Sequence, residues 1–127
     1  DFAELSGILA QFKSGKEEIF LKRMGREETA LWYDAVDMRN ISVLVVEWTH
    51  GNNDLLTGVD IPVLLNSTPE ETLAHRKLRA RDGAPDSPFT TMVLEIEQEL
   101  LRSQAHKAKI VVSKSCELLT PEQVKAL

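Results

Sequence analysis

Three short apolar runs, separated by segments with helical features, constrain the fold of this chain more than any other feature. The strongest run is Ser42 to Glu47, and two more cover Ile61 to Leu65 and Lys109 to Ser113. Runs of this kind, rich in β-branched residues, are typical of strands buried on both faces of a sheet. A short helical segment around Asp54 to Leu56, ended by Gly58, is expected between the first two. Strands that alternate with helices imply parallel crossovers, so the sequence predicts an α/β fold with helices covering the sheet.

The helices between these runs are predicted from their first residues. Thr68-Pro69-Glu70-Glu71 combines a capping threonine, a proline at the first helical position and a glutamate that closes the capping box. Ser87-Pro88 and Thr120-Pro121 open two further helices in the same way. The helix after Ser87 carries an apolar stripe at helical spacing, which predicts one buried face. This stripe consists of Phe89, Met92, Val93, Ile96 and Leu100.

The first forty residues have weaker patterns. An apolar stripe from Phe2 to Phe12 predicts a helix that ends near Gly15. Ile19 to Leu21 can form a short strand, and the polar run Lys22 to Thr29 has the composition of a loop. Because no repeat or linker interrupts the chain, residues 1–127 are expected to form a single α/β unit.

Composition narrows the class of protein. The net charge is -5, whereas nucleic-acid binding normally needs a basic surface, so we expect no nucleic-acid partner. No apolar run approaches the roughly 20 residues that cross a bilayer, so no membrane partner is expected either. The single cysteine, Cys116, excludes an internal disulfide and suits a reducing, cytoplasmic location.

The first candidate site follows the strongest predicted strand. Ligands of open α/β sheets gather at the carboxyl ends of the strands, and this rule points to Glu47 and His50. A carboxylate there can hold a magnesium ion or accept a proton, and it can equally pair with a neighbouring helix. His50 is open to a role in substrate contact or in loop packing.

A basic stretch provides the second candidate. Arg76 and Arg79 share one face of the predicted helix, and Lys77 and Arg81 share another. Guanidinium groups held in this way can grip phosphate oxygens in pairs, although a solvated surface helix has the same pattern. The turn from Asp82 to Pro88 that follows gives the helix-turn-helix arrangement of a lid over a nucleotide.

Several motifs are missing. A phosphate-binding P-loop needs two glycines five positions apart, followed by Lys and Ser or Thr, and no pair of glycines here meets this spacing. No dinucleotide-binding glycine motif, nucleophile elbow or metal-ligand cluster occurs. The glycines are Gly7, Gly15, Gly25, Gly51, Gly58 and Gly83.

Taken in order, these features resemble the second half of the uridine kinase and phosphoribulokinase group of P-loop kinases, over nearly the whole chain. The matching segments are the opening helix from Phe2 to Lys16, the strands Val43 to Glu47, Asp60 to Leu65 and Ile110 to Ser113, and the arginine-rich run His75 to Asp82. The nucleoside-contacting Tyr-Asp-Phe of that group is not reproduced at Ile19 to Arg26. Tyr33-Asp34 comes later, so the acceptor is open between a nucleoside, a sugar and another hydroxyl compound.

The resemblance implies a three-layer, P-loop-kinase-like parallel sheet with helices on both faces, in which the first, P-loop strand is absent from this chain. Residues 1–127 would be the C-terminal portion of a kinase-like domain, with a lid at about 75–90. The missing strand usually lies between the strands at 43–47 and 61–65. Their unpaired edges predict a homo-oligomer or a strand-swapped form, since open edges recruit other chains.

For the complete protein the resemblance implies an ATP-dependent kinase that uses Mg²⁺ and a small-molecule phosphoryl acceptor. Glu47 would lie near the metal and its water shell, and Arg76, Arg79 and Arg81 would offset charge on the nucleotide phosphates. Arg23, Arg26 and His50 are the candidate acceptor contacts. Without its N-terminal half, the chain is expected to bind neither ATP nor Mg²⁺ tightly and to be inactive alone.

Two other classes of function stay open. A non-catalytic α/β interaction or regulatory module, fused to another enzyme, explains the missing P-loop directly. An autonomous small-molecule-binding domain would use the Glu47 and arginine cleft without any other part of the protein.

Overall fold

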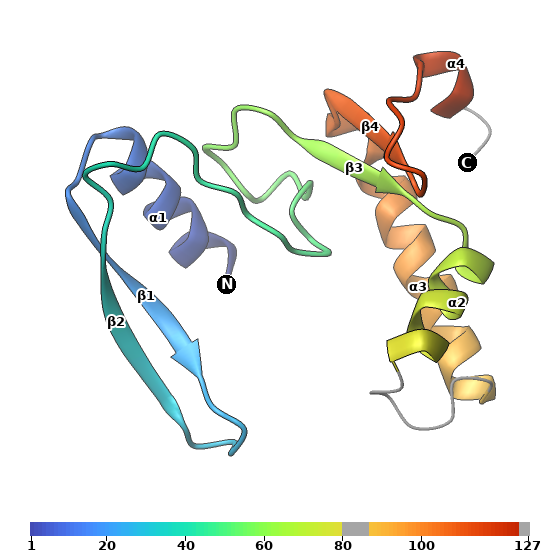
Figure 1. Cartoon of the computed structure of the whole chain (residues 1–127), viewed down its shortest axis with the longest axis horizontal. Coiled ribbons are helices and arrows are strands. Elements are labelled where there is room, and N and C mark those ends of the chain that lie inside the picture. Colours follow the sequence, from blue (N-terminus) through green and yellow to red (C-terminus); the bar gives the residue numbers. More distant parts are fainter. Residues whose placement is uncertain (80–86, 125–127) are drawn as a thin grey trace. The chain divides into compact units, whose positions relative to one another are not determined.

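A computed structural model describes residues 1–79 and 87–124, without the side chains of Arg79 and Pro121 (Figure 1). The chain divides into two compact units, each described here by itself. Unit 1 comprises Asp1–Val46 and Leu55–Val59, and unit 2 comprises Glu47–Asp54 and Asp60–Leu127.

Unit 1 is a helix with an antiparallel hairpin. Helix α1 (Phe2–Lys13) begins at Asp1, whose carboxylate accepts the backbone N–H groups of Ala3 and Glu4, and it ends before Gly15. Gly15 has a φ of 80°, a conformation that glycine adopts without a Cβ penalty, as the sequence predicts for a helix end. Strands β1 (Glu18–Met24) and β2 (Leu31–Asp37) form the hairpin.

Four apolar side chains form the core of unit 1: Leu9, Ile19, Met38 and Leu56. Gly58 has a φ of 93°, and a Cβ there would lie 3.2 Å from the Leu9 Cβ. The segment 55–59 therefore passes close to α1 only because residue 58 is glycine. Gly58 was predicted to end a short helix at 54–56, but the structure has only a turn there.

Unit 2 contains a parallel strand pair. Strands β3 (Val63–Asn66) and β4 (Ile110–Ser113) align with Val63 opposite Ile110 and Asn66 opposite Ser113. A parallel pair needs a long crossover, and here the crossover consists of helices. The helices of this unit are α2 (Pro69–Arg79), α3 (Pro88–Gln104), the 3₁₀ turn η1 (Ala105–Lys107) and α4 (Pro121–Val124).

The predicted helix starts are confirmed. Thr68 Oγ1 accepts the Glu71 N–H at 3.2 Å, and Glu71 Oε2 accepts the Thr68 N–H at 3.0 Å, which is the reciprocal capping box. Ser87 Oγ accepts the Thr90 N–H at 3.2 Å. Thr120 and Gln123 cap α4 reciprocally. Each device acts over three residues, so the sequence is sufficient to specify it.

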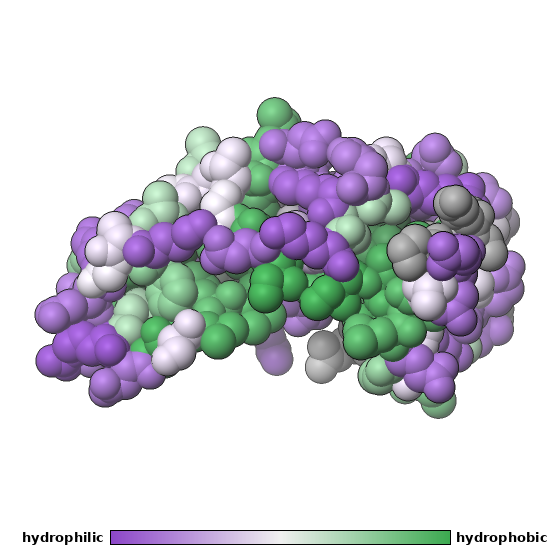
Figure 2. Space-filling view, turned by 90° about the horizontal axis from the view of Figure 1, so that it is seen from above, coloured by the Kyte–Doolittle hydropathy of each residue, from purple (hydrophilic) through white to green (hydrophobic). Residues whose placement is uncertain are grey.

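The predicted strand at 42–47 is wrong. Residues 41–48 form no strand, and no described segment pairs with them. Val43 is 74% exposed and Val45 80% exposed, whereas Leu44 and Val46 are half-buried. β-Propensity favours an extended backbone here, but a strand also needs a neighbour that takes its backbone hydrogen bonds. Figure 2 shows that hydrophobic residues, in green, are exposed among purple hydrophilic ones on the face in view.

The predicted buried face of α3 is only partly correct. Phe89, Met92 and Ile96 are exposed and Val93 and Leu100 are half-buried, whereas the fully buried side chains are Thr90, Leu94 and Gln104. At 3.6 residues per turn the two faces lie roughly 90° apart around the helix. Contact with neighbouring elements such as α2, rather than the position of the apolar stripe, therefore decides which face is covered.

The hairpin was only partly predicted. β1 contains the expected strand at Ile19 to Leu21 but continues through Met24, so the first residues expected in a loop are strand. β2 was missed, although it contains Trp32, Tyr33 and Val36, which are residue types enriched in strands. The described residues form two separate two-stranded sheets. The continuous parallel sheet, and the single unit spanning the chain, stay predictions.

Candidate functional site

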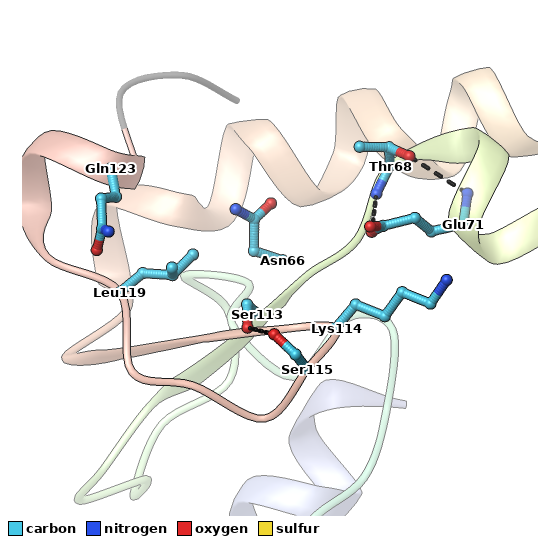
Figure 3. A pocket seen from close by; sticks show the side chains of 8 residues that line it. All are labelled: Asn66, Thr68, Glu71, Ser113, Lys114, Ser115, Leu119 and Gln123. Atoms are coloured by element: carbon cyan, nitrogen blue, oxygen red, sulfur yellow. Dashed lines mark hydrogen bonds between the residues drawn. The ribbon is translucent and has the colours of Figure 1, made fainter.

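A cavity of ≈ 460 Å³ lies in unit 2 where the carboxyl ends of β3 and β4 meet (Figure 3). Asn66 and Ser113 are the last residues of the two strands and lie opposite each other in the sheet. The first turn of α2 and the segments that follow β4 complete the lining. The lining residues are Asn66, Thr68, Glu71, Ser113, Lys114, Ser115, Leu119 and Gln123.

The lining after β4 is a tight loop that folds back on its own strand. The Ser113 carbonyl accepts the Cys116 N–H at 2.9 Å, and the Glu117 carbonyl accepts the Ser113 N–H at 2.9 Å. Cys116 has a φ of 64°, which is uncommon for a residue other than glycine. The hydroxyls of Ser113 and Ser115 lie 3.0 Å apart (Figure 3). The loop therefore presents two hydroxyls and the Lys114 ammonium at one end of the sheet.

Of the two charged groups that line the cavity, one is engaged in a helix cap and the other has no side-chain partner among the described residues. Glu71, which lines it, is engaged in the α2 capping box. The pKa of the neighbouring Glu70 is lowered, first by its own backbone N–H and then by the Thr68 hydroxyl. Within residues 1–79 and 87–124, neither the Lys114 ammonium nor the Asn66 amide has a side-chain partner. Lys114 is exposed, so it can meet an anionic group without first breaking an ion pair.

These groups suit binding rather than bond-making on their own. Hydroxyls, amides and an ammonium donate hydrogen bonds to phosphate oxygens or to the polar edge of a base. Among the described residues, the lining contains no histidine or cysteine to act as a nucleophile or base at neutral pH. The cavity is therefore a candidate ligand site at the edge of a parallel strand pair, where α/β proteins bind their ligands.

The predicted residues Glu47 and His50 lie in the segment 47–54 of unit 2, outside the cavity lining. Glu47 is exposed and has no ion-pair partner among the described residues. The His50 ring makes an edge contact with Trp48, with ring centroids 5.1 Å apart at 78°. This contact accounts for part of the packing of the half-buried histidine.

Unit 2 holds the segment 47–54 by specific polar contacts. The Asn52 Nδ2 donates to the Val63 carbonyl at 2.9 Å, and the Lys107 Nζ donates to the Asn53 carbonyl at 2.8 Å. His106 Nε2 lies 3.2 Å from Asp54 Oδ1. Hydrogen bonds to β3 and η1 thus hold the backbone of the segment that carries Glu47 in place.

The three predicted lid arginines have different outcomes. Arg76 NH2 forms an ion pair with Glu97 Oε2 at 3.1 Å, and both side chains are partly shielded from solvent. This pair bridges α2 and α3, so Arg76 has a structural partner as well as its predicted role. Arg79 is the last residue of α2, and its side chain is not described; Arg81 lies outside the described residues. Their assignment to a nucleotide lid stays a prediction.

The predicted acceptor residues Arg23 and Arg26 belong to the hairpin of unit 1. Arg23 Nε lies 3.2 Å from Asp34 Oδ2, which makes a cross-strand ion pair. Arg26 is exposed in the turn between β1 and β2. Arg23 and Arg26 thus belong to unit 1, whereas Glu47 and His50 belong to unit 2.

Sequence reasoning missed the cavity residues, although a signal existed. The rule about carboxyl ends was applied to the run at 42–47, which forms no strand. Applied to the other two runs, the same rule points to Asn66 and to Ser113, Lys114 and Ser115.

No group of three His, Cys, Asp or Glu side chains within residues 1–79 and 87–124 is placed to hold a metal ion.

Comparisons with known proteins give one informative match. The chain is 46% identical, over 114 residues, to a segment of a bifunctional alpha-galactosidase/sucrose kinase of Mediterraneibacter gnavus. The match covers 90% of this chain but 12% of that protein. No protein-family model matches the chain, and no solved structure matches it significantly. In the part of the chain that the structure describes, no helix is both long and apolar enough to span a bilayer. The chain is thus similar to a short segment of an enzyme that carries a kinase activity.

Proposed function

We propose that this chain is part of an ATP-dependent phosphotransferase that transfers a phosphoryl group to a hydroxyl of a small molecule, with sucrose or a related sugar as the first candidate acceptor. The observation that carries the proposal is the polar cavity, with its lysine, at the joined carboxyl ends of β3 and β4. Open α/β sheets bind nucleotides at this edge. The sucrose kinase activity named for the 46% identical relative supports both the reaction and the acceptor.

The cavity favours the kinase activity over the galactosidase activity of that relative. Glycoside hydrolysis uses two carboxylates that face each other roughly 5–10 Å apart across the sugar. Glu71 is the single carboxylate of the described lining, and its side chain is engaged in the α2 cap. An ammonium with hydroxyls and amides instead matches phosphate recognition.

The predicted residues have plausible places in this reaction. Glu47 is an exposed carboxylate without an ion-pair partner in the described part, and Mg²⁺ accepts one or two such oxygens together with water and phosphates. We assign it to the water shell of the Mg²⁺ bound with ATP, where the metal would neutralise phosphate charge. Arg76, Arg79 and Arg81 would offset further charge. The uridine-kinase-like fold and the cytoplasmic location belong to the same proposal.

The experiment that tests the proposal is a calorimetric titration of Mg-ATP into this chain and into the complete protein. We expect binding by the complete protein and weak or no binding by the chain alone. In the complete protein, Lys114→Ala should weaken Mg-ATP binding about tenfold, because it removes a charge-assisted phosphate contact. Lys16→Ala removes the same charge from unit 1 and is the matched control.

Turnover provides the second arm of the test. Glu47→Gln and Arg79→Ala in the complete protein should each lower kcat by about a hundredfold or more, since charge stabilisation dominates phosphoryl transfer. Arg102→Ala removes an exposed arginine of α3 and should leave kcat within about twofold, because surface ion pairs contribute little. Near-normal turnover of both Glu47→Gln and Arg79→Ala would remove these assignments.

The second candidate function is a non-catalytic interaction or regulatory module. The exposed Val43 and Val45 and the exposed stripe on α3 favour it, because apolar surface of this kind is typical of partner contacts. It predicts that neither the chain nor the complete protein needs Lys114 for nucleotide binding. Tight Mg-ATP binding by the chain alone would instead indicate an autonomous binding domain.

The predicted oligomerisation or strand swap would follow from the same exposed surface and is checked by light scattering.

A further inference from the structure

One face of the hairpin in unit 1 changes character along its length. Paired residues of an antiparallel ladder share a face, so Ile19 and Val36 lie on the same face as Arg23 and Trp32. Ile19 is fully buried and Val36 half-buried, whereas Trp32 is 47% exposed. The tip of the hairpin projects beyond α1 (Figure 1). The core therefore uses the base of this face and leaves its outer part open.

The open part combines an aromatic ring with a pair of charged groups. Trp32 lies directly opposite Arg23 in the ladder, and Asp34 follows two residues later on the same face. Arg23 Nε and Asp34 Oδ2 lie 3.2 Å apart, and both side chains are about half exposed. Among the described residues, the indole N–H of Trp32 has no hydrogen-bond partner. The cluster thus presents one apolar ring face beside donors and acceptors of both charges.

The turn places Gly25 near the ring of Trp32. A Cβ placed on Gly25 would lie 2.6 Å from the Ala30 Cβ and 3.5 Å from Trp32 Cζ3. The Gly25 N–H donates to the Ala30 carbonyl at 2.8 Å, which closes the turn. The close approach of Ala30 leaves room only for glycine at position 25, and Trp32 Cζ3 would be at ordinary contact distance from a Cβ at that position.

We propose that this face binds the sugar acceptor, with a pyranose ring stacked on Trp32 and with Arg23 and Asp34 bonded to its hydroxyls. The inference rests on the proposed phosphotransferase function and deepens it by giving acceptor recognition to unit 1. The C–H bonds on one side of a pyranose carry partial positive charge, and the face of an indole ring is negative. Vicinal hydroxyls both donate and accept, which matches a carboxylate beside a guanidinium.

The opposite face of the hairpin is less suited to a ligand. Its Tyr33 hydroxyl lies 3.3 Å from Glu4 Oε1, and the Lys22 ammonium lies 5.9 Å from the centre of the Tyr33 ring. Lys22 Nζ also pairs with Glu4 Oε2 at 3.1 Å. Lys22 and Tyr33 of that face are thus engaged with α1, so Tyr33 offers a control aromatic one residue away from Trp32.

The test uses the indole resonances of the ¹⁵N-labelled 127-residue chain, which contains two tryptophans. Trp32→Phe assigns the two signals, and sucrose is then titrated into the chain. We expect a saturable shift of the Trp32 signal and no shift of the Trp48 signal. Sorbitol, an acyclic polyol without a pyranose face, is the control for bulk effects, and uridine is the competing class of acceptor.

Variants separate recognition from folding. Trp32→Ala, Arg23→Gln and Asp34→Asn should each weaken sucrose binding about tenfold, whereas Tyr33→Phe should change it less than about twofold. Preserved chemical shifts in β1 and β2 show that the hairpin is intact in each variant. The spectrum of the chain without ligand is the reference for both the variants and the titration.

The outcomes distinguish this inference from the proposed function. The proposal that this face binds a sugar is wrong if sucrose shifts neither indole signal, or if uridine shifts the Trp32 signal and sucrose does not. This holds even where the complete protein transfers phosphate from ATP. If sucrose saturably shifts the Trp32 signal but the complete protein transfers no phosphate, sugar binding by this face is confirmed and the proposed phosphotransferase function is wrong.

Discussion

The two units place their polar groups differently. In unit 1 the ion pairs are on the surface, joining Glu4 to Lys22, Arg23 to Asp34 and Arg39 to Asp37, above a core of aliphatic side chains. Unit 2 instead buries the polar side chains of Asn52, Thr90 and Gln104 and has a polar cavity at its strand ends. Exposed ion pairs contribute little to stability, whereas buried polar groups are costly unless they are satisfied. The comparison teaches that unit 1 is stabilised mainly by apolar packing, and that unit 2 depends on specific hydrogen bonds.

The prediction with the largest expected effect concerns whether the two units unfold independently. Ile19→Ala and Leu64→Ala each truncate a buried core side chain, one in each unit. Each should lower the free energy of unfolding of its own unit by about 2–5 kcal/mol, because truncation leaves a cavity. Hydrogen exchange, read separately on the amides of β1–β2 and of β3–β4, measures this. Equal loss of protection in both sheets for either variant would show that the chain unfolds as one unit.

The second prediction compares two buried amides of unit 2. The Asn52 amide donates to the Val63 carbonyl at 2.9 Å, whereas the Gln104 amide has no partner among the described residues. Gln104→Leu should therefore raise the free energy of unfolding by about 1–2 kcal/mol, and Asn52→Leu should lower it by a similar amount. Urea unfolding measures both. A destabilised Gln104→Leu would indicate that this amide is satisfied by a group such as a buried water.

The third prediction concerns a cap that also lines the cavity. Thr68→Ala removes the hydroxyl that accepts the Glu71 N–H and should cost about 1 kcal/mol. Thr68→Ser keeps the hydroxyl and should restore most of this stability. The measurement is the thermal unfolding of both variants, followed by amide shifts in α2. Equal destabilisation by Ala and Ser would mean that the threonine methyl, and not the cap, matters.

The smallest expected effect is the pH response of the link between α1 and the hairpin in unit 1. The hydrogen bond from Lys22 holds the pKa of Glu4 below its ordinary value of 4.5, and the bond to Glu4 raises the pKa of Lys22 above 10.5. The lowered carboxyl pKa gives stability that is present above pH 4.5 and lost as the pH falls through the folded pKa. The raised lysine pKa gives stability present below pH 10.5 and lost as the pH rises through its folded pKa. Carbon-detected NMR titration of Glu4, with Lys22→Gln as control, should show the carboxyl pKa returning to its ordinary value.

Local features of the sequence predicted well. The three helix starts and the end of α1 at Gly15 follow from contacts within a few residues. The capping residues therefore determine where unit 2 forms helices, whatever those helices later contact.

The errors concern pairing and burial. The run at 42–47 has the composition of a core strand but no pairing partner in the described chain, whereas β2 pairs with β1 although most of its side chains are exposed. The stripe from Phe89 to Leu100 was expected inside, and α3 turns another face to its neighbours. The cavity was missed for the same reason, since its lining joins residues from β3, α2, the loop after β4 and α4.

The sequence alone thus determined the three helix starts and the end of α1, and it predicted strands at the positions of β3 and β4. The roles of Glu47, Arg23, Arg26, His50 and the lid arginines stay predictions. Only the tertiary structure decided that Arg76 bridges to Glu97, that Arg23 pairs with Asp34 beside an exposed Trp32, and that Lys114 lies in a cavity. The physical reason is range: a cap or a positive φ is settled within three or four residues, whereas a strand partner, a buried face or a binding site needs segments far apart in the chain to meet.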